Sequence, residues 1–170
     1  WTLSTTIKHV VTTDEGLRWV DATLPAPAAE EVLIEIQFAG VNRADLLQAK
    51  GAYPPPPGAS EALGLECSGI VVEIGENVAT DLKPGTRVMA LLAGGGYATH
   101  ALVPVDQVVP LTKHLGLVEG AGHDLGRHIG PIRVIRFDLT HGTQRRLQPI
   151  AFHNVPCNMT NLGPQPRTRC

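Results

Sequence analysis

The clearest element in the hydrophobic pattern is a β-strand over residues 32–38. Val32, Ile34, Ile36 and Phe38 recur at every second position, and polar residues stand between the later ones. A period of two places alternate side chains on one face of a strand. We therefore expect these four side chains to point into a hydrophobic core.

A short helix is predicted directly after this strand. Asn42 is a favourable N-cap residue, and Asp45, three positions later, can return a hydrogen bond to the start of the helix and face its positive end. The helix should run to about Lys50 and stop at Gly51. This structural role accounts for both Asn42 and Asp45 without any function.

Proline and glycine then divide the chain into short strands and turns. The run Pro54–Pro57 stiffens the loop after the helix, and Lys83-Pro84-Gly85-Thr86 fits a type II turn, with Pro at the second position and Gly at the third. Gly94–Gly96 is expected to form a loop and no phosphate-binding cradle, because no strand–turn–helix surrounds it. With 18 Gly and 14 Pro in 170 residues, the pattern favours a mainly β fold with one or two short helices.

The composition changes after residue 121. Residues 1–121 hold 7 basic and 14 acidic residues, whereas residues 122–170 hold 7 arginines, no lysine and 2 acidic residues. Apart from a short apolar stretch near Ile132–Phe137, the later part shows no sustained period of 2 or 3.6. We therefore predict a folded domain over residues 1–120 and an irregular basic tail over residues 121–170.

Three interpretations of this tail remain open. A basic segment can bind nucleic acid, but these arginines are scattered and lack interleaved aromatic residues, which argues against that partner. The tail can also be a poorly ordered terminus. Finally, the loss of lysine with a gain of arginine, histidine and proline is typical of an out-of-frame translation of a GC-rich gene, which is the interpretation that the composition favours.

Several other functional classes find no support in the sequence. The uncharged stretch Val88–Pro104 is interrupted by glycines and a histidine, so no membrane span is expected. Without a signal peptide or a disulfide framework, we expect a cytoplasmic protein. His114, His123, His128, His153 and Cys157 match no standard metal-site spacing.

The glycines at residues 120–126 do not make a dinucleotide-binding loop. Such a loop follows a buried strand and opens a helix whose amides face the pyrophosphate. The segment Gly120–Gly126 has no such flanking pattern, and only 44 residues follow it. A Rossmann domain is therefore expected to be absent from this chain.

Several motifs in order resemble one enzyme family. They are GVNRADLLQAKGAYPPPPGAS, GLECSGIVVEIGENV, LKPGTRVMALL and GGGYATHALVP, within residues 7–119. This part is similar to the N-terminal GroES-like domain of the medium-chain dehydrogenase/reductase superfamily. The resemblance is to its zinc-independent quinone oxidoreductases, including the p53-inducible and zeta-crystallin-like members. It implies a partly open barrel of short strands.

The resemblance also implies that no zinc is bound. Zinc-binding members of the superfamily have a cysteine ligand where this chain has Asn42 and a histidine ligand where it has Leu65. Leu65 has no donor atom and Asn42 is a poor zinc ligand, which leaves only Glu66 of that set. Glu66 itself is expected to be structural, paired with a backbone group.

For the function, the resemblance implies NADPH-dependent hydride transfer to a quinone or an activated alkene. By the same resemblance Asn42 and Arg43 contact the cofactor. Tyr53 lines the substrate cleft as the catalytic candidate, through ring stacking or a hydrogen bond to the substrate carbonyl, and Leu65 is a further cleft residue. Packing of the Tyr53 ring on Pro54–Pro57 is the structural alternative.

We expect the 170-residue chain to be inactive alone, because most nucleotide contacts would come from the domain that it lacks. The alternative function is a non-enzymatic binding module that associates with itself through the exposed face of the cleft.

Overall fold

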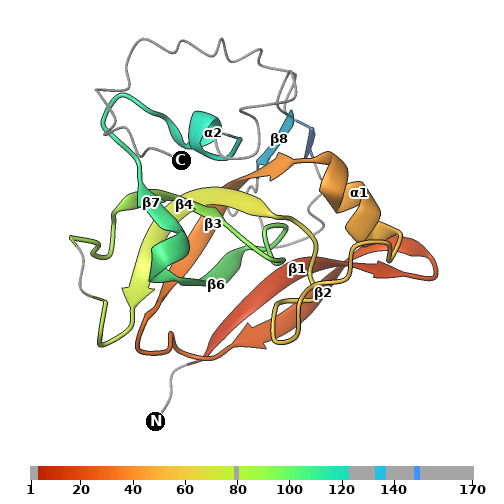
Figure 1. The fold of residues 1–170 in the computed structure, drawn as a ribbon, viewed down its shortest axis with the longest axis horizontal. Coiled ribbons are helices and arrows are strands. Elements are labelled where there is room, and N and C mark those ends of the chain that lie inside the picture. Colours follow the sequence, from red (N-terminus) through yellow and green to blue (C-terminus); the bar gives the residue numbers. More distant parts are fainter. Residues whose placement is uncertain (1–3, 79–80, 123–132, 137–147, 150–170) are drawn as a thin grey trace, which may run out of the picture.

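Strand β3 (Glu31–Val41) is the centre of the fold, because three other strands pair with it (Figure 1). β4 (Glu66–Ile74) lies antiparallel along one edge. The other edge is shared: β6 (His100–Pro104) pairs with residues 31–35, and β8 (Arg133–Arg136) pairs with residues 38–41. The computed structural model describes residues 4–78, 81–122, 133–136 and 148–149.

The larger sheet continues outward from both sides of β3. β5 (Arg87–Leu91) pairs with β4, and β7 (Val108–Pro110) pairs with β5 after the 3-10 turn Val105–Gln107. On the far side β9 (Gln148–Pro149) pairs with β8. The order of the described strands is β7-β5-β4-β3-β8-β9, with β6 paired to β3 beside this path.

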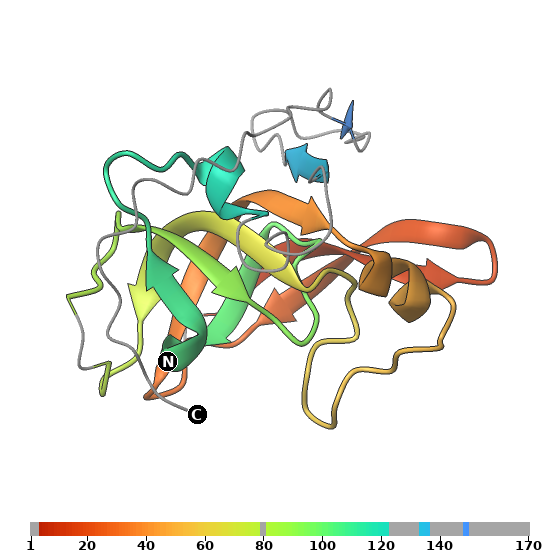
Figure 2. The same cartoon turned by 45° about the horizontal axis from the view of Figure 1, so that its top comes forward.

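A separate hairpin lies beside the larger sheet. β1 (Thr5–Thr13) and β2 (Gly16–Leu24) form a two-stranded antiparallel sheet that projects beyond the larger sheet (Figure 2). Backbone hydrogen bonds join it to the rest of the molecule: Val10 N–H donates to Tyr97 O at 2.8 Å, and Thr99 N–H donates to Lys8 O at 2.8 Å. These bonds bridge the two sheets without forming one continuous ladder. The expected mainly β, partly open architecture is confirmed.

Most side chains predicted to form the buried face of β3 are buried, but the prediction is wrong for the last one. Val32, Ile34 and Ile36 are fully buried. Phe38 is only half-buried, so the expectation that it shares their face is wrong, and Ala39 takes the next fully buried position. The reason is a register shift between Ile36 and Phe38, where an irregularity in the pairing with β4 shifts the alternation by one residue.

Within the described residues, two short helices flank the sheet. Helix α1 (Arg43–Ala49) begins directly after β3 and ends at the Lys50 cap, followed by Gly51 with φ +68°, as predicted. Helix α2 (Leu117–Gly120) lies over β4 and β5 (Figure 1). The turn predicted at Lys83–Thr86 is also confirmed, since Thr86 N–H donates to Lys83 O at 3.0 Å and Gly85 has φ +91°.

Two segments of the later part of the chain form strands, although an irregular tail was predicted there. Arg133–Arg136, inside the apolar stretch noted in the sequence, forms β8 and completes the second edge of β3, and Gln148–Pro149 extends this pairing as β9. Most of residues 121–170 lie outside the described residues, so the predicted boundary near residue 120 stays a prediction. Among the described residues, no helix is long and apolar enough to cross a membrane.

Candidate functional site

The candidate site is built where β3 passes into α1. Asn42 stands between them in extended conformation, and its backbone N–H donates to Asp45 Oδ2 at 2.6 Å. Asp45 N–H in turn donates to Asn42 O at 3.2 Å. The predicted return of a hydrogen bond from Asp45 to the start of the helix is therefore confirmed, and it fixes the backbone of Asn42.

The side chain of Asn42 points to a second acid. Its Nδ2 donates to Glu66 Oε1 at 2.6 Å, across 24 residues of sequence. Glu66 is 2% exposed at the start of β4, whereas Asn42 is half-buried. Gly40 leaves the room for this carboxylate, since a Cβ there would lie 2.1 Å from Glu66 Oε1. The expected structural role of Glu66 thus involves a side-chain partner, the Asn42 carboxamide.

Tyr97 supports the same junction from the interior. Its hydroxyl donates to Asp45 Oδ2 at 2.7 Å and lies 3.4 Å from Gly40 O. Tyr97 follows Gly94–Gly96, and Gly64 lies so close to its ring that a Cβ there would come within 2.6 Å. The sequence reasoning missed Tyr97, because no periodicity or spacing signals a contact between residues 52 positions apart.

Burial dominates the electrostatics of this cluster. It raises the pKa of Asp45, although the Asn42 amide, the Tyr97 hydroxyl and the Leu65 amide oppose the rise. The pKa of Tyr97 is raised by burial first and then by the charge of Asp45, its hydrogen bond and the charge of Glu66. Tyr97 therefore stays protonated and acts as a permanent hydrogen-bond donor to Asp45.

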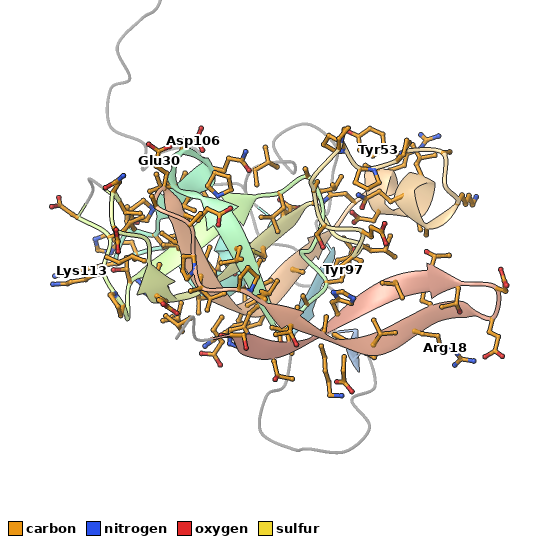
Figure 3. All side chains as sticks on the ribbon, turned by 90° about the horizontal axis from the view of Figure 1, so that it is seen from below. Arg18, Glu30, Tyr53, Tyr97, Asp106 and Lys113 are labelled. Atoms are coloured by element: carbon orange, nitrogen blue, oxygen red, sulfur yellow. The ribbon has the colours of Figure 1, made fainter. Side chains whose placement is uncertain are left out.

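The predicted site residues fall into two groups. Asn42 and Leu65 lie together. Leu65 directly precedes Glu66, the partner of Asn42, and the backbone amide of Leu65 donates a hydrogen bond that opposes the rise that burial causes in the pKa of Asp45. Leu65 is 7% exposed and belongs to the core, whereas Arg43 is exposed at the first position of α1. Tyr53 is 49% exposed and lies beside α1 (Figure 3), beyond the end of that helix. The structure therefore does not bring Tyr53 into the buried cluster.

The residues at this junction do not fit a zinc ion. Leu65 has no donor atom, and Asn42 turns its Nδ2, which has no lone pair to give a metal, toward Glu66. Within the described ranges no three His, Cys, Asp or Glu side chains are grouped so that they could hold a metal ion. His114 is exposed, and the other histidines and the cysteine considered with it lie outside the described residues.

Gly94–Gly96 forms no phosphate cradle, and only residues 120–122 of the second glycine-rich segment lie within the described part of the chain. Gly94 and Gly96 pack against backbone, since a Cβ at Gly94 would lie 2.4 Å from Ser60 O and one at Gly96 would lie 2.9 Å from Gly64 C. Gly120 ends helix α2 instead of following a strand. Of the two residues predicted to contact a cofactor, Asn42 is half-buried and Arg43 is exposed, so both are accessible to the ring end of a nicotinamide.

A shallow groove of about 320 Å³ lies elsewhere, between the hairpin and strands β3 and β6. Lys8, Asp21, Glu35 and His100 are among its lining residues. Lys8 Nζ and Asp21 Oδ1 form an exposed ion pair at 2.5 Å. Burial lowers the pKa of His100, opposed by the charge of Glu35. None of the predicted site residues lines this groove.

Comparison with known proteins identifies the family of the domain. Residues 28–113, half of the chain, match the family model described as the alcohol dehydrogenase GroES-like domain. A trans-enoyl reductase from Aspergillus flavipes is 33% identical over 106 residues, covering 57% of this chain and 31% of that protein. A quinone oxidoreductase from Sus scrofa is 35% identical over 102 residues, covering 59% of this chain and 31% of that protein.

The fold is also similar to that of a solved oxidoreductase structure. The Escherichia coli quinone oxidoreductase complexed with NADPH aligns with a TM-score of 0.59 and 29% identity, covering 72% of this chain and 37% of that one. The chain thus spans about a third of the length of these two curated relatives.

Proposed function

Because this chain belongs to the alcohol dehydrogenase GroES-like domain family and its relatives are oxidoreductases, we propose that it forms the substrate side of a zinc-independent, NADPH-dependent reductase. The acceptor would be a quinone or a related carbonyl-conjugated alkene. The names of the relatives support both acceptor classes, since one is a quinone oxidoreductase and another a trans-enoyl reductase.

The observation that carries the proposal is the pairing of Asn42 with Glu66 at the end of β3. At this junction the buried acid accepts a 2.6 Å hydrogen bond from the neutral Asn42 carboxamide. With Leu65 beside it, the site offers a polar contact and an apolar wall. This combination suits a flat, uncharged ring better than metal-assisted chemistry.

The proposed roles follow from exposure and chemistry. When bound, a reduced nicotinamide supplies the hydride. Asn42 and Arg43 would orient its ring end, and Tyr53 would hold the acceptor through its exposed ring or hydroxyl. Leu65 would exclude water from the inner end of the cleft. The expectation that the chain alone is inactive belongs to this proposal and is tested with it.

The proposal can be tested on the 15N-labelled 170-residue chain by 1H–15N spectroscopy. We expect NADPH to shift the signals of Asn42 and Arg43, and 9,10-phenanthrenequinone to shift those of Tyr53 and Leu65. Leu17→Ala is a matched control for Tyr53→Ala, because Leu17 is 48% and Tyr53 49% exposed. Only Tyr53→Ala should weaken quinone binding.

Two outcomes contradict parts of this proposal. Shifts confined to the groove at Lys8 and His100 would place the ligand away from the α1 junction. A low-micromolar dissociation constant for NADPH together with quinone turnover by this chain would show that the expected inactivity is wrong.

The second candidate function, a self-associating module, is favoured by one observation. Leu46, Leu47 and Tyr53, on α1 and just after it, are 60%, 41% and 49% exposed. An apolar surface of this kind favours contact with a second copy. Sedimentation velocity over a hundredfold concentration range should then show association that Leu46→Glu abolishes. A monomer at every concentration would exclude this candidate.

A further inference from the structure

Two different buried acids hold Asn42. Asp45 accepts from its backbone N–H at 2.6 Å, and Glu66 accepts from its side-chain Nδ2 at 2.6 Å. Asp45 is 4% and Glu66 is 2% exposed. Asp45 is needed for the helix start, as the sequence already indicates. Glu66 lies on β4, so its contact with Asn42 joins β4 to the end of β3.

The chemistry of a carboxylate determines how the carboxamide is turned. An ionised carboxylate only accepts hydrogen bonds, while the Asn42 side chain has a donor end, Nδ2, and an acceptor end, Oδ1. The end that faces Glu66 is therefore the nitrogen, and Oδ1 faces away from Glu66, at the helix start where Asn42 and Asp45 form a capping box. The buried position of Glu66, above Gly40, leaves the carboxylate little freedom to move.

The geometry points to Glu66 as the positioning residue of Asn42, fixing which end of its carboxamide is offered to a bound ring that carries a carboxamide, such as nicotinamide. This inference rests on the proposed role of Asn42 in the function above. Glutamine at position 66 would keep the size of the side chain but could present either its oxygen or its nitrogen. The orientation of Asn42 would then no longer be unique.

The first test needs no ligand and follows the side-chain amide protons of Asn42, with exposed Asn77 as the reference. In the unmodified chain we expect the Asn42 protons to exchange with solvent about tenfold more slowly than those of Asn77. In Glu66→Gln the Asn42 side-chain amide protons should exchange about tenfold faster than in the unmodified chain. Ser68→Ala is the matched control, because Ser68 is a buried polar residue two positions along β4 whose hydroxyl bonds Leu117 O.

The outcomes are decisive even if Glu66→Gln does not fold. Equal exchange of Asn42 and Asn77 in the unmodified chain would overturn the inference without any variant. If the variant folds, unchanged protection of Asn42 would overturn it too. Loss of protection in Glu66→Gln but not in Ser68→Ala would support it.

The second test adds NADPH and separates this inference from the proposed function. The dissociation constant for NADPH can be read from the shift of the Asn42 Nδ2 signal. We expect it to be about tenfold higher in Glu66→Gln than in the unmodified chain. A shift that Glu66→Gln leaves intact would overturn the positioning role. No shift in the unmodified chain would instead contradict the proposed function, while the exchange rates in the free chain still decide whether Glu66 orients Asn42.

Discussion

The hydroxyl of Tyr97 donates a 2.7 Å hydrogen bond to Asp45 Oδ2, the same oxygen that accepts the backbone N–H of Asn42. One buried carboxylate oxygen thus joins the segment before β6 to the start of α1. Figure 3 shows Tyr97 in the interior of the molecule and Tyr53 at the outside, beside α1. The two tyrosines therefore have different roles, one in stability and one in the proposed binding site.

Removing the hydroxyl of Tyr97 should destabilise the fold. Tyr97→Phe deletes a buried hydrogen bond to a carboxylate, so we expect the free energy of unfolding to fall by about 1.5–3 kcal/mol. Tyr53→Phe, at an exposed position, should change it by less than about 0.5 kcal/mol. Denaturant unfolding of both variants measures the difference. Equal effects would contradict the role assigned to Tyr97.

The raised pKa of Asp45 predicts a definite pH dependence. Because burial raises the folded-state pKa above its ordinary value, the folded protein holds this proton more tightly than the unfolded chain does. The stabilisation linked to this proton is complete below the unfolded-state pKa, near 3.8, and is lost as the pH rises through the folded-state pKa. Asp45→Asn removes this titration.

Unfolding free energies of the unmodified chain and Asp45→Asn, compared from pH 3.5 to 8, provide the measurement. The stability of the unmodified chain relative to the variant should decrease with rising pH and then level off. A relative stability that increases over this range would show that the Asp45 pKa is lowered in the fold.

A methyl group at Gly40 should disrupt the site. A Cβ there would lie 2.1 Å from Glu66 Oε1 and 2.5 Å from Ala121 O, so Gly40→Ala should cost about 1–3 kcal/mol and move the Asn42 side-chain signals. Gly58→Ala is the control, because nothing lies within 4 Å of its Cβ and only its φ of +86° is strained. It should cost about 1 kcal/mol and leave Asn42 unchanged.

Cys67 should be unreactive in the folded chain. It is fully buried, and burial followed by the charge of Glu66 raises the pKa of its thiol to about 12. At pH 8, iodoacetamide should modify it about a thousandfold more slowly than in guanidinium chloride, where the thiol has an ordinary pKa. Peptide mass spectrometry gives the site. Rapid labelling without denaturant would mean that β4 opens readily.

For Tyr53, two substitutions separate stacking from hydrogen bonding. If the ring stacks on the acceptor, Tyr53→Phe should bind 9,10-phenanthrenequinone within about twofold of the unmodified chain, and Tyr53→Ala should lose about tenfold. If the hydroxyl donates to the carbonyl, Tyr53→Phe should lose about as much as Tyr53→Ala. Titrations followed by NMR distinguish these results, and no loss in either variant would remove Tyr53 from the site.

The sequence predicted local features well and contacts between distant segments poorly. The helix after Asn42 and the turn at Lys83–Thr86 depend on a few neighbouring residues, and both are confirmed. The burial of Phe38 was predicted wrongly, because a register shift depends on the partner strand as well as on β3. The links of Asn42 to Glu66 and of Tyr97 to Asp45 span 24 and 52 residues, so only the assembled fold reveals them.

The shared edge of β3 has a consequence for the order in which the chain can fold. The hairpin β1–β2 pairs with itself and can form once residue 24 has left the ribosome. The edge of β3, in contrast, needs residues 100–104 for its first half and residues 133–136 for its second. Such distant pairing is slow, because a long loop must close before any contact compensates. During synthesis, residues 38–41 therefore emerge as a strand edge that stays open to other chains until Arg133–Arg136 have left the ribosome.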